Sequence, residues 1–219
     1  RQMCIRDRPG ARLVNQDSDA FTSPCDGIVG AMGTVEDGRV YQAKGFPYTL
    51  RDLLGDDVRH KQWRDGVFMT IRITSSMYHR FHAPFNGRLK HVHYFSGDTW
   101  NVNPIALKRV EKLFCKNERA FLNLEIGEAQ HAVALVPVAA VLVASIRLHA
   151  LDTLFHTRYA GPMDITCDVP FTKGEELGWF QHGSTILVFA PKGFLIDPGI
   201  QEGARIQMGQ VLMRLPQQT

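Results

Sequence analysis

The chain has 219 residues, of which 44% are hydrophobic and 21% are charged, and its formal net charge is +3. These fractions are those of an ordinary globular protein, and the mild charge gives no sign of nucleic-acid binding. The length suits one domain with a sizeable core, or at most two. The four cysteines form no Cys-x-x-Cys pair and no zinc-like spacing, so we expect free thiols in a reducing compartment.

Short runs rich in β-branched residues, separated by Gly-centred turns, predict a closed or sandwiched antiparallel sheet. The predicted strands cover residues 27–32, 39–43, 67–74, 87–94, 120–126, 129–136, 137–148, 185–189 and 210–214. Glu36-Asp37-Gly38 and Gly127-Glu128 each predict a hairpin. Short helices are expected at residues 49–54 and 104–110, and residues 75–82 should form a turn or a short helix. The expected fold is therefore mainly β with a few short helices.

The N-terminal part and the apolar runs bear on domain organisation. No signal peptide is visible, and residues 1–22 are expected to be a truncated N-terminal segment before a domain covering residues 23–219. The longest apolar stretch, residues 131–146, is too short to cross a bilayer and is interrupted by Pro137. We interpret it as buried strands.

Five short segments carry residues suited to chemistry. Three of them are Ser23-Pro24-Cys25-Asp26-Gly27, Gln42-Ala43-Lys44-Gly45 and Tyr78-His79-Arg80-Phe81-His82-Ala83-Pro84-Phe85-Asn86-Gly87. The other two are Leu113-Phe114-Cys115-Lys116-Asn117-Glu118-Arg119 and His182-Gly183-Ser184-Thr185. Gly183 has no Cβ, so a nucleophile can approach its carbonyl and its backbone can adopt strained angles. The Ser184 hydroxyl is well placed to attack that carbonyl.

Asp26, His82 and Ser184 have the residue types of an acid–base–nucleophile set. Asp, His, Ser is one of the chain orders in which such triads occur. In such a set the histidine, oriented by the aspartate, takes the proton of the serine. Taken singly, Asp26 and Ser184 are each typical of an ordinary turn.

The histidines also allow a metal site. His79 and His82 would share a face if they were helical, and their spacing suits metal ligands. His91 and His93 lie on one face of a predicted strand and could complete such a site. A solvent-exposed strand face is the alternative for that pair, and local structure is the alternative for the first pair.

The five segments resemble the motifs of the phosphatidylserine decarboxylases, in the family order and at similar separations, from about residue 23 to about residue 212. The family motifs are P-x-D-G, Q-x-K-G, Y-H-R-x-H-x-P-x-x-G, L-F-x-x-N-E-R and G-S-[ST]. His182 departs from the pattern, which usually has Leu or Val before the glycine. The resemblance implies a barrel-sandwich arrangement similar to the sugar-phosphotransferase IIA and biotinyl-carrier type.

The resemblance further implies self-cleavage between Gly183 and Ser184. The products would be a β subunit, residues 1–183, and an α subunit, residues 184–219, which stay together as a heterodimer. Ser184 would attack Gly183 to form an ester, and β-elimination and hydrolysis would leave a pyruvoyl group as covalent cofactor. Its carbonyl would act as an electron sink for decarboxylation of phosphatidylserine to phosphatidylethanolamine. His79 would donate the proton that quenches the carbanion.

The implied substrate also predicts a location. A diacyl lipid leaves a bilayer at a cost of about 0.8 kcal/mol per CH₂, so the site should open toward a lipid surface. We expect a peripheral membrane enzyme on the cytoplasmic face of the bacterial inner membrane, with a homodimer as a further expectation. The predicted docking loop covers residues 151–159, with Phe155, His156, Arg158 and Tyr159 as contacts beside the Ser184 pocket.

Two other classes of function stay open at this point. A β-rich carrier could accept a phosphoryl group on His79 or His82 without cleaving itself. A serine hydrolase could use the triad on an external acyl bond, although no G-x-S-x-G elbow surrounds Ser184. Within the decarboxylase interpretation, a related serine-headgroup lipid or a small amino-acid derivative is an alternative substrate.

Overall fold

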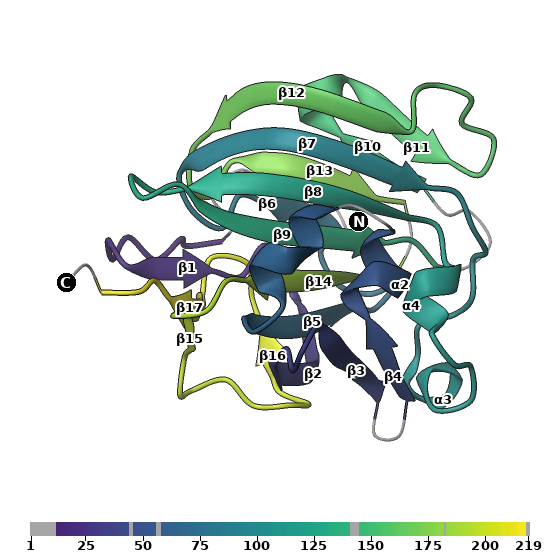
Figure 1. Ribbon diagram of the computed structural model, residues 1–219, viewed down its shortest axis with the longest axis horizontal. Coiled ribbons are helices and arrows are strands. Elements are labelled where there is room, and N and C mark those ends of the chain that lie inside the picture. Colours follow the sequence, from purple (N-terminus) through teal and green to yellow (C-terminus); the bar gives the residue numbers. More distant parts are fainter. Residues whose placement is uncertain (1–11, 44–45, 56–57, 141–144, 182, 218–219) are drawn as a thin grey trace.

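A computed structural model describes residues 12–43, 46–55, 58–140, 145–181 and 183–217 (Figure 1). Its largest unit is an antiparallel sheet with the strand order β12-β7-β8-β9-β14-β5-β2-β16. Its strands are β12 (Asp164–Phe171), β7 (Gly87–Phe95), β8 (Arg119–Ile126), β9 (His131–Val138), β14 (Ser184–Ala190), β5 (Val67–Ile73), β2 (Gly27–Thr34) and β16 (Arg205–Ile206).

Three smaller sheets and several short helices complete the described chain. One sheet has the order β11 (Thr153–His156), β10 (Ser145–Leu148), β13 (Glu176–Phe180), β6 (Arg80–His82). The others are β1 (Ala20–Thr22), β17 (Val211–Arg214), β15 (Leu195–Ile196), and the pair β3 (Arg39–Ala43), β4 (Phe46–Thr49). The helices are α2 (Leu50–Leu54), α3 (Pro104–Leu107), α4 (Leu113–Lys116) and the 3₁₀ helices η1 (Val58–Trp63) and η2 (His149–Leu151). Figure 1 shows α2, α3 and α4 grouped on one side and β1, β15 and β17 on the other. None of the described helices has the length and apolar character needed to cross a membrane.

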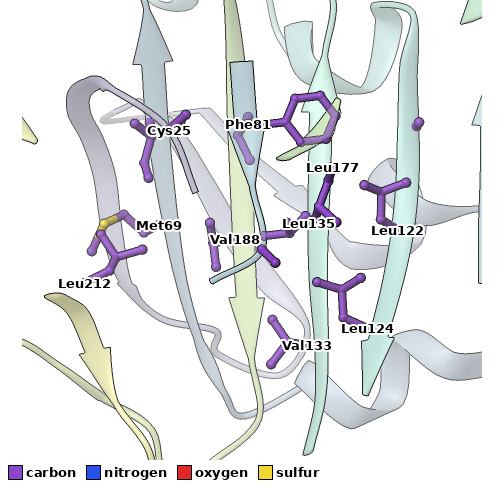
Figure 2. Close-up of a cluster of buried hydrophobic side chains, with 14 of the residues drawn as sticks. Cys25, Met69, Phe81, Leu122, Leu124, Val133, Leu135, Leu177, Val188 and Leu212 are labelled. Atoms are coloured by element: carbon purple, nitrogen blue, oxygen red, sulfur yellow. The ribbon is translucent and has the colours of Figure 1, made fainter. Parts of the chain in front are cut away.

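The eight-stranded sheet is buried on both faces, and β14 shows this most clearly. Ile186 and Val188 belong to a first core, which also holds side chains of the four-stranded sheet, such as Phe81 (Figure 2). Leu187 and Phe189 belong to a second core, which also holds side chains of α2 and α4. Because successive side chains of a strand point to opposite faces, a strand between two cores is apolar at every position.

The mainly antiparallel β architecture predicted from the sequence is confirmed. The strands expected at residues 67–74, 87–94, 120–126 and 185–189 form with ends shifted by only one or two residues. The helix expected at residues 49–54 also forms, and Thr49 caps it in a capping box with Asp52. The likeness to IIA and biotinyl-carrier domains stays a prediction.

Other local predictions were wrong. The turn at Glu36–Arg39 forms, with positive φ at Asp37 and Gly38, but β2 and β3 belong to different sheets. The turn expected from Ser75 forms at residues 75–76, but residues 80–82 form a strand, and α3 ends at residue 107 instead of 110. β12 was not predicted, because its residues alternate between half-buried and exposed instead of forming an apolar run.

Gln42, from the second sequence motif, has a structural role. Its side-chain nitrogen donates to Leu107 O and Val110 O, each at 2.8 Å. Its side-chain oxygen accepts from the backbone N–H of Leu113 at 2.5 Å and of Phe114 at 3.4 Å. One buried side-chain amide therefore provides hydrogen-bond partners for backbone groups of the segment that runs from α3 to α4. Lys44 and Gly45 of the same motif lie outside the described residues.

We expect Gln42→Ala to lower the free energy of unfolding by about 3 kcal/mol, because it leaves several buried backbone groups without partners. The measurement is urea unfolding in a Ser184→Ala background, which keeps the chain in one piece. Gln201→Ala, at an exposed turn, is the matched control and should change stability by about 0.5 kcal/mol or less. Equal stabilities of the two variants would contradict this role.

Candidate active site

Ser184 is the first residue of β14 and is completely buried. Because side chains alternate along the strand, it lies on the same face as Ile186 and therefore points toward the first core. Its hydroxyl has no hydrogen-bond partner among the described residues. A buried hydroxyl without a partner costs about 1–3 kcal/mol, so this position is unusual in a folded protein and marks a candidate reactive group.

The predicted site segments meet at the end of the sheet where β14 begins. Ser184 pairs with Ile73 at the end of β5. Four residues earlier, Phe180 N donates to His79 O at 2.9 Å. His82 N in turn donates to Pro24 O at 2.8 Å, next to Asp26. Hydrogen bonds thereby join segments that lie far apart in the sequence.

Gly27 allows the close approach of β2 to β5. A Cβ at this position would lie 2.3 Å from Ile71 Cγ2 and 3.0 Å from Arg72 O. No side chain larger than a hydrogen fits there without moving β5. Asp26 is therefore fixed at the edge of the site by the glycine that follows it.

His82 is buried, and both of its ring nitrogens are hydrogen-bonded. Nδ1 lies 2.8 Å from Gly174 O, so this nitrogen carries the proton and donates it. Nε2 then accepts from the Tyr78 hydroxyl at 2.9 Å. Burial lowers the pKa of His82 below its usual value, with Gly174 O opposing the shift. The ring is neutral at pH 7 and has the protonation state of a base.

The expected hydrogen bond between Asp26 and His82 is not present. The Asp26 carboxylate instead accepts from Arg12 Nε at 3.0 Å and Arg12 Nη2 at 2.6 Å, and from Met208 N at 3.0 Å. Gly174 O takes the orienting position on the ring that the sequence analysis assigned to Asp26. Asp26 still raises the pKa of His82 through its charge, although burial and other groups have larger effects.

Tyr78 and Arg12 are site residues that the sequence analysis missed. The Tyr78 ring stacks on His82 with 5.7 Å between ring centroids, and the Arg12 guanidinium lies 5.7 Å from the Tyr78 ring. Contacts thus run from Asp26 through Arg12 and Tyr78 to His82. Tyr78 stands inside a recognised motif and so gave a signal, whereas Arg12 lies in a segment without any motif.

His79 lies beside the cleavage segment but not on a helix with His82. It is half-buried and immediately precedes β6, so the helical spacing that suggested a shared face does not apply. Its backbone carbonyl accepts the hydrogen bond from Phe180 N, and its role as proton donor stays a prediction.

His91 and His93 form a separate cluster on the opposite face of the sheet from Ser184. Both rings lie against Asp164 Oδ1, at 2.5 and 2.9 Å. His91 is buried against Phe121 of the second core, so the expectation of a solvent-exposed face was wrong for this residue. The described residues contain no group of three or more His, Cys, Asp or Glu that could hold a metal.

The loop predicted to dock on a membrane is only partly exposed. Phe155 is completely buried and stacks on Tyr94 with 4.8 Å between ring centroids, so its assignment as a membrane contact was wrong. Leu154 and Arg158 are exposed. The loop also reaches the first core, because the Tyr94 hydroxyl donates to His156 O at 2.9 Å.

Glu118 is a second buried polar group on the Ser184 face. Neither of its carboxylate oxygens has a hydrogen-bond partner among the described residues. The Tyr94 hydroxyl interacts with the Glu118 carboxylate, but its hydrogen bond goes to the backbone carbonyl of His156 at 2.9 Å. Burial raises the pKa of Glu118 to about 7, with Tyr94 opposing the shift. The sequence motif contained this residue, but the motif alone assigned it no role.

We expect Glu118→Gln to stabilise the uncleaved Ser184→Ala chain at pH 8 but not at pH 4.5. The pKa of Glu118 in the folded chain lies above the ordinary value of 4.5, so the folded state favours the protonated carboxyl group. The resulting stabilisation is complete below pH 4.5 and is lost as pH rises through 7. Glutamine does not ionise, so the variant should gain up to about 3 kcal/mol between these pH values.

Urea unfolding at both pH values measures this difference. Glu125→Gln, a half-exposed carboxylate on the same strand, is the matched control and should change stability by about 0.5 kcal/mol or less. A gain from Glu118→Gln that is independent of pH would show that the pKa of Glu118 is the same in the folded and the unfolded chain.

Comparisons with known proteins relate the chain to one family. The family model described as "Phosphatidylserine decarboxylase" matches residues 2–214. A phosphatidylserine decarboxylase proenzyme of Myxococcus xanthus is 38% identical over 205 residues, covering 93% of this chain and 72% of the relative. Proenzymes of Shewanella putrefaciens and Halorhodospira halophila are 36% and 39% identical, covering 95% of this chain and 74% and 71% of the relatives.

Proposed function

Because the chain belongs to the phosphatidylserine decarboxylase family, we propose that it is a proenzyme that cleaves itself at Gly183–Ser184 and then decarboxylates phosphatidylserine. The observation that carries the proposal is the buried, unpartnered Ser184 hydroxyl at the start of β14. Gly183 suits this position because a Cβ there would lie 3.1 Å from Ile73 O. Close packing against β5 therefore favours glycine at this position. His182 lies outside the described residues.

His82 is the proposed base for the attack of Ser184 on Gly183. It is neutral, and its Nδ1–H is held by Gly174 O, so Nε2 is the nitrogen that can accept a proton. In the intact chain the Tyr78 hydroxyl donates a hydrogen bond to that nitrogen. Transfer of the Ser184 proton to Nε2 therefore requires Tyr78 to leave or to pass the proton on. Asp26 supports the charged ring electrostatically.

Position 184 suits a pyruvoyl cofactor made from the serine. Such a group supplies a carbonyl that accepts the electrons released when CO₂ leaves. The first core encloses residue 184, which keeps bulk water away from it. His79 is the proposed proton donor to the product, because its backbone is fixed beside Phe180, four residues before Ser184.

The two products of cleavage should stay together. The proposed α subunit contains β14, which pairs with β5 and β9 of the β subunit. Its later strands β16 and β17 pair with β2 and β1. Every one of these strand pairs joins the two pieces, so an αβ heterodimer follows from the sheet itself.

The phosphoryl-carrier alternative finds less support. A phosphoryl acceptor needs an accessible ring nitrogen, whereas His82 is 7% exposed and has both nitrogens hydrogen-bonded. The carrier interpretation also gives Ser184 no role. We therefore favour the self-cleaving decarboxylase.

The proposed membrane contact is the edge strand β11 and the loop after it. Among the described strands β11 pairs only with β10, so its other edge faces away from the sheet. Leu154 and Arg158 are its exposed apolar and basic residues. This pairing of an apolar and a basic side chain suits an anionic lipid surface, and we place the enzyme at the cytoplasmic face of a bacterial inner membrane.

We expect the wild-type chain to split into residues 1–183 and 184–219, with a pyruvoyl group blocking the new N-terminus. Ser184→Ala should remain intact, because no hydroxyl is left to attack. His82→Ala should slow cleavage by about 10²–10⁴-fold, as is usual for loss of a general base. His79→Ala should still cleave but decarboxylate poorly.

Intact mass and product release from phosphatidylserine vesicles measure the two steps separately. His149→Ala, a half-exposed histidine on η2, is the control for losing an imidazole near β13. A wild-type preparation that stays in one piece would overturn the proposed function. Equal cleavage defects in His79→Ala and His82→Ala would reject the division of roles.

For the membrane contact, we expect Arg158→Ala to weaken sedimentation with phosphatidylglycerol vesicles about fivefold, since a basic residue near such a surface contributes about 1 kcal/mol. The effect should vanish in 0.5 M salt, which screens surface charge. Leu154→Ser removes an exposed apolar side chain from the proposed contact. Its control is Leu195→Ser, which removes an exposed leucine from β15. Unchanged binding of Arg158→Ala and Leu154→Ser would rule out this edge.

A further inference from the structure

Glu118 and Ser184 occupy the same row of the central sheet. Val138 pairs with Arg119 on one side and with Thr185 on the other. In antiparallel strands the next row therefore holds Glu118, Ala139 and Ser184, and Ala139 N donates to Glu118 O at 2.9 Å. Only one strand position separates the carboxyl group from the serine.

All three side chains of this row project toward the first core. Ala120 and Leu122 on β8 belong to this core, so alternation places Glu118 there too. Ala139 also belongs to it, and Ser184 shares the face of Ile186. Neighbouring strands lie about 4.8 Å apart, so the two Cα atoms lie about 10 Å apart with only a methyl group between them. A glutamate side chain spans much of that distance.

Glu118 differs from Asp26, the acidic residue that the sequence predicted for the site. The Asp26 carboxylate accepts hydrogen bonds from the Arg12 side chain and from Met208 N. Among described carboxylates, Glu118 alone has both oxygens buried without a hydrogen-bond partner. Two unpartnered polar groups, one acidic and one a nucleophile, thus share an apolar interior across Ala139. Neither the attack on Gly183 nor the orientation of His82 uses Glu118.

We propose that Glu118 is the base that removes the α-hydrogen of Ser184 during self-processing. The proposal rests on the proposed cleavage at Gly183–Ser184. Once the ester has formed, the Glu118 carboxylate takes the α-proton, and the electrons of the Cα–H bond form a Cα–Cβ double bond. The Cβ–Oγ bond breaks, and Oγ leaves as part of the Gly183 carboxylate. Glu118 ends protonated and can return its proton to Cβ, before water releases the nitrogen as ammonia.

Burial suits Glu118 to this step. An ordinary carboxylate is a weak base, whereas burial raises the pKa of Glu118 to about 7, so it is a stronger base that is still ionised in part at neutral pH. The titratable group that faces it is Tyr94 from β7, whose pKa burial also raises, so it stays neutral. Arg119 projects to the opposite face of β8, and the Asp98 side chain is bound to Trp100.

Trapping with hydroxylamine at neutral pH tests the proposal, because under these conditions the reagent cleaves an ester but leaves ordinary peptide bonds intact, and a cut at the Asn86–Gly87 bond would be recognised by its different fragment masses. In Glu118→Gln the ester should form but eliminate about 10²–10⁴-fold more slowly. Hydroxylamine should then release residues 184–219 with a free serine at the N-terminus, whereas the wild type gives a pyruvoyl group. Ser184→Ala should resist the reagent, and Glu125→Gln, on the same strand, should process like the wild type.

Two outcomes would overturn the assignment. One is a folded Glu118→Gln chain that stays intact and resists hydroxylamine, which would place Glu118 at or before the attack. The other is pyruvoyl formation by Glu118→Gln at the wild-type rate. Glu118→Asp, which keeps a carboxylate, provides a second test if the glutamine variant does not fold. It should process measurably, and its ester should decay faster as pH rises.

The wild-type pH profile separates this proposal from the proposed function. Decay of the ester should accelerate as pH rises through about 7 and then level off, because the carboxylate form is the base. A decay rate independent of pH between 5 and 8 would remove Glu118 as the base while leaving cleavage itself established. Absence of any wild-type cleavage would overturn the proposed function instead.

Discussion

The central strand β14 is the element on which the site depends, because it is held by β5 and β9 along its edges and by apolar cores on both faces. Its first residue carries the candidate nucleophile. A strand held in this way cannot move toward a catalytic group. The catalytic groups must therefore lie close to its first residue. Breaking the chain in front of Ser184 removes no pairing within the sheet. The same constraint therefore positions the reaction and preserves the fold after it.

Burial also sets the protonation states that the chemistry needs. It keeps the His82 ring neutral and raises the pKa of Glu118 toward neutrality. Both shifts arise because an apolar surrounding disfavours the charged form, which makes a histidine a weaker base and a carboxylate a stronger one. Asp26, in contrast, is paired with Arg12.

The recognised motifs combine reactive and structural residues, often side by side. Asn117 donates to Trp100 O and Ala139 O, and Arg119 donates to Leu53 O and Cys115 O. These two residues fasten the chain around the start of β8. Glu118 between them makes no such bond, and it projects toward the core that contains Ser184. Neighbours in one motif thus serve different purposes because alternate side chains of a strand enter different cores.

The sequence by itself determined the β-rich class, the family and the segments that would meet, since turn residues, apolar runs and motifs are local features. It also identified Ser184 and His82 as candidates. Only the tertiary structure decided their hydrogen-bond partners: Gly174 O, rather than Asp26, orients His82, and Phe155 is buried rather than exposed. The sequence also did not reveal that Glu118 and Ser184 share a row of the sheet. Strand register brings together these residues, which are 66 positions apart, through pairings that no local sequence pattern specifies.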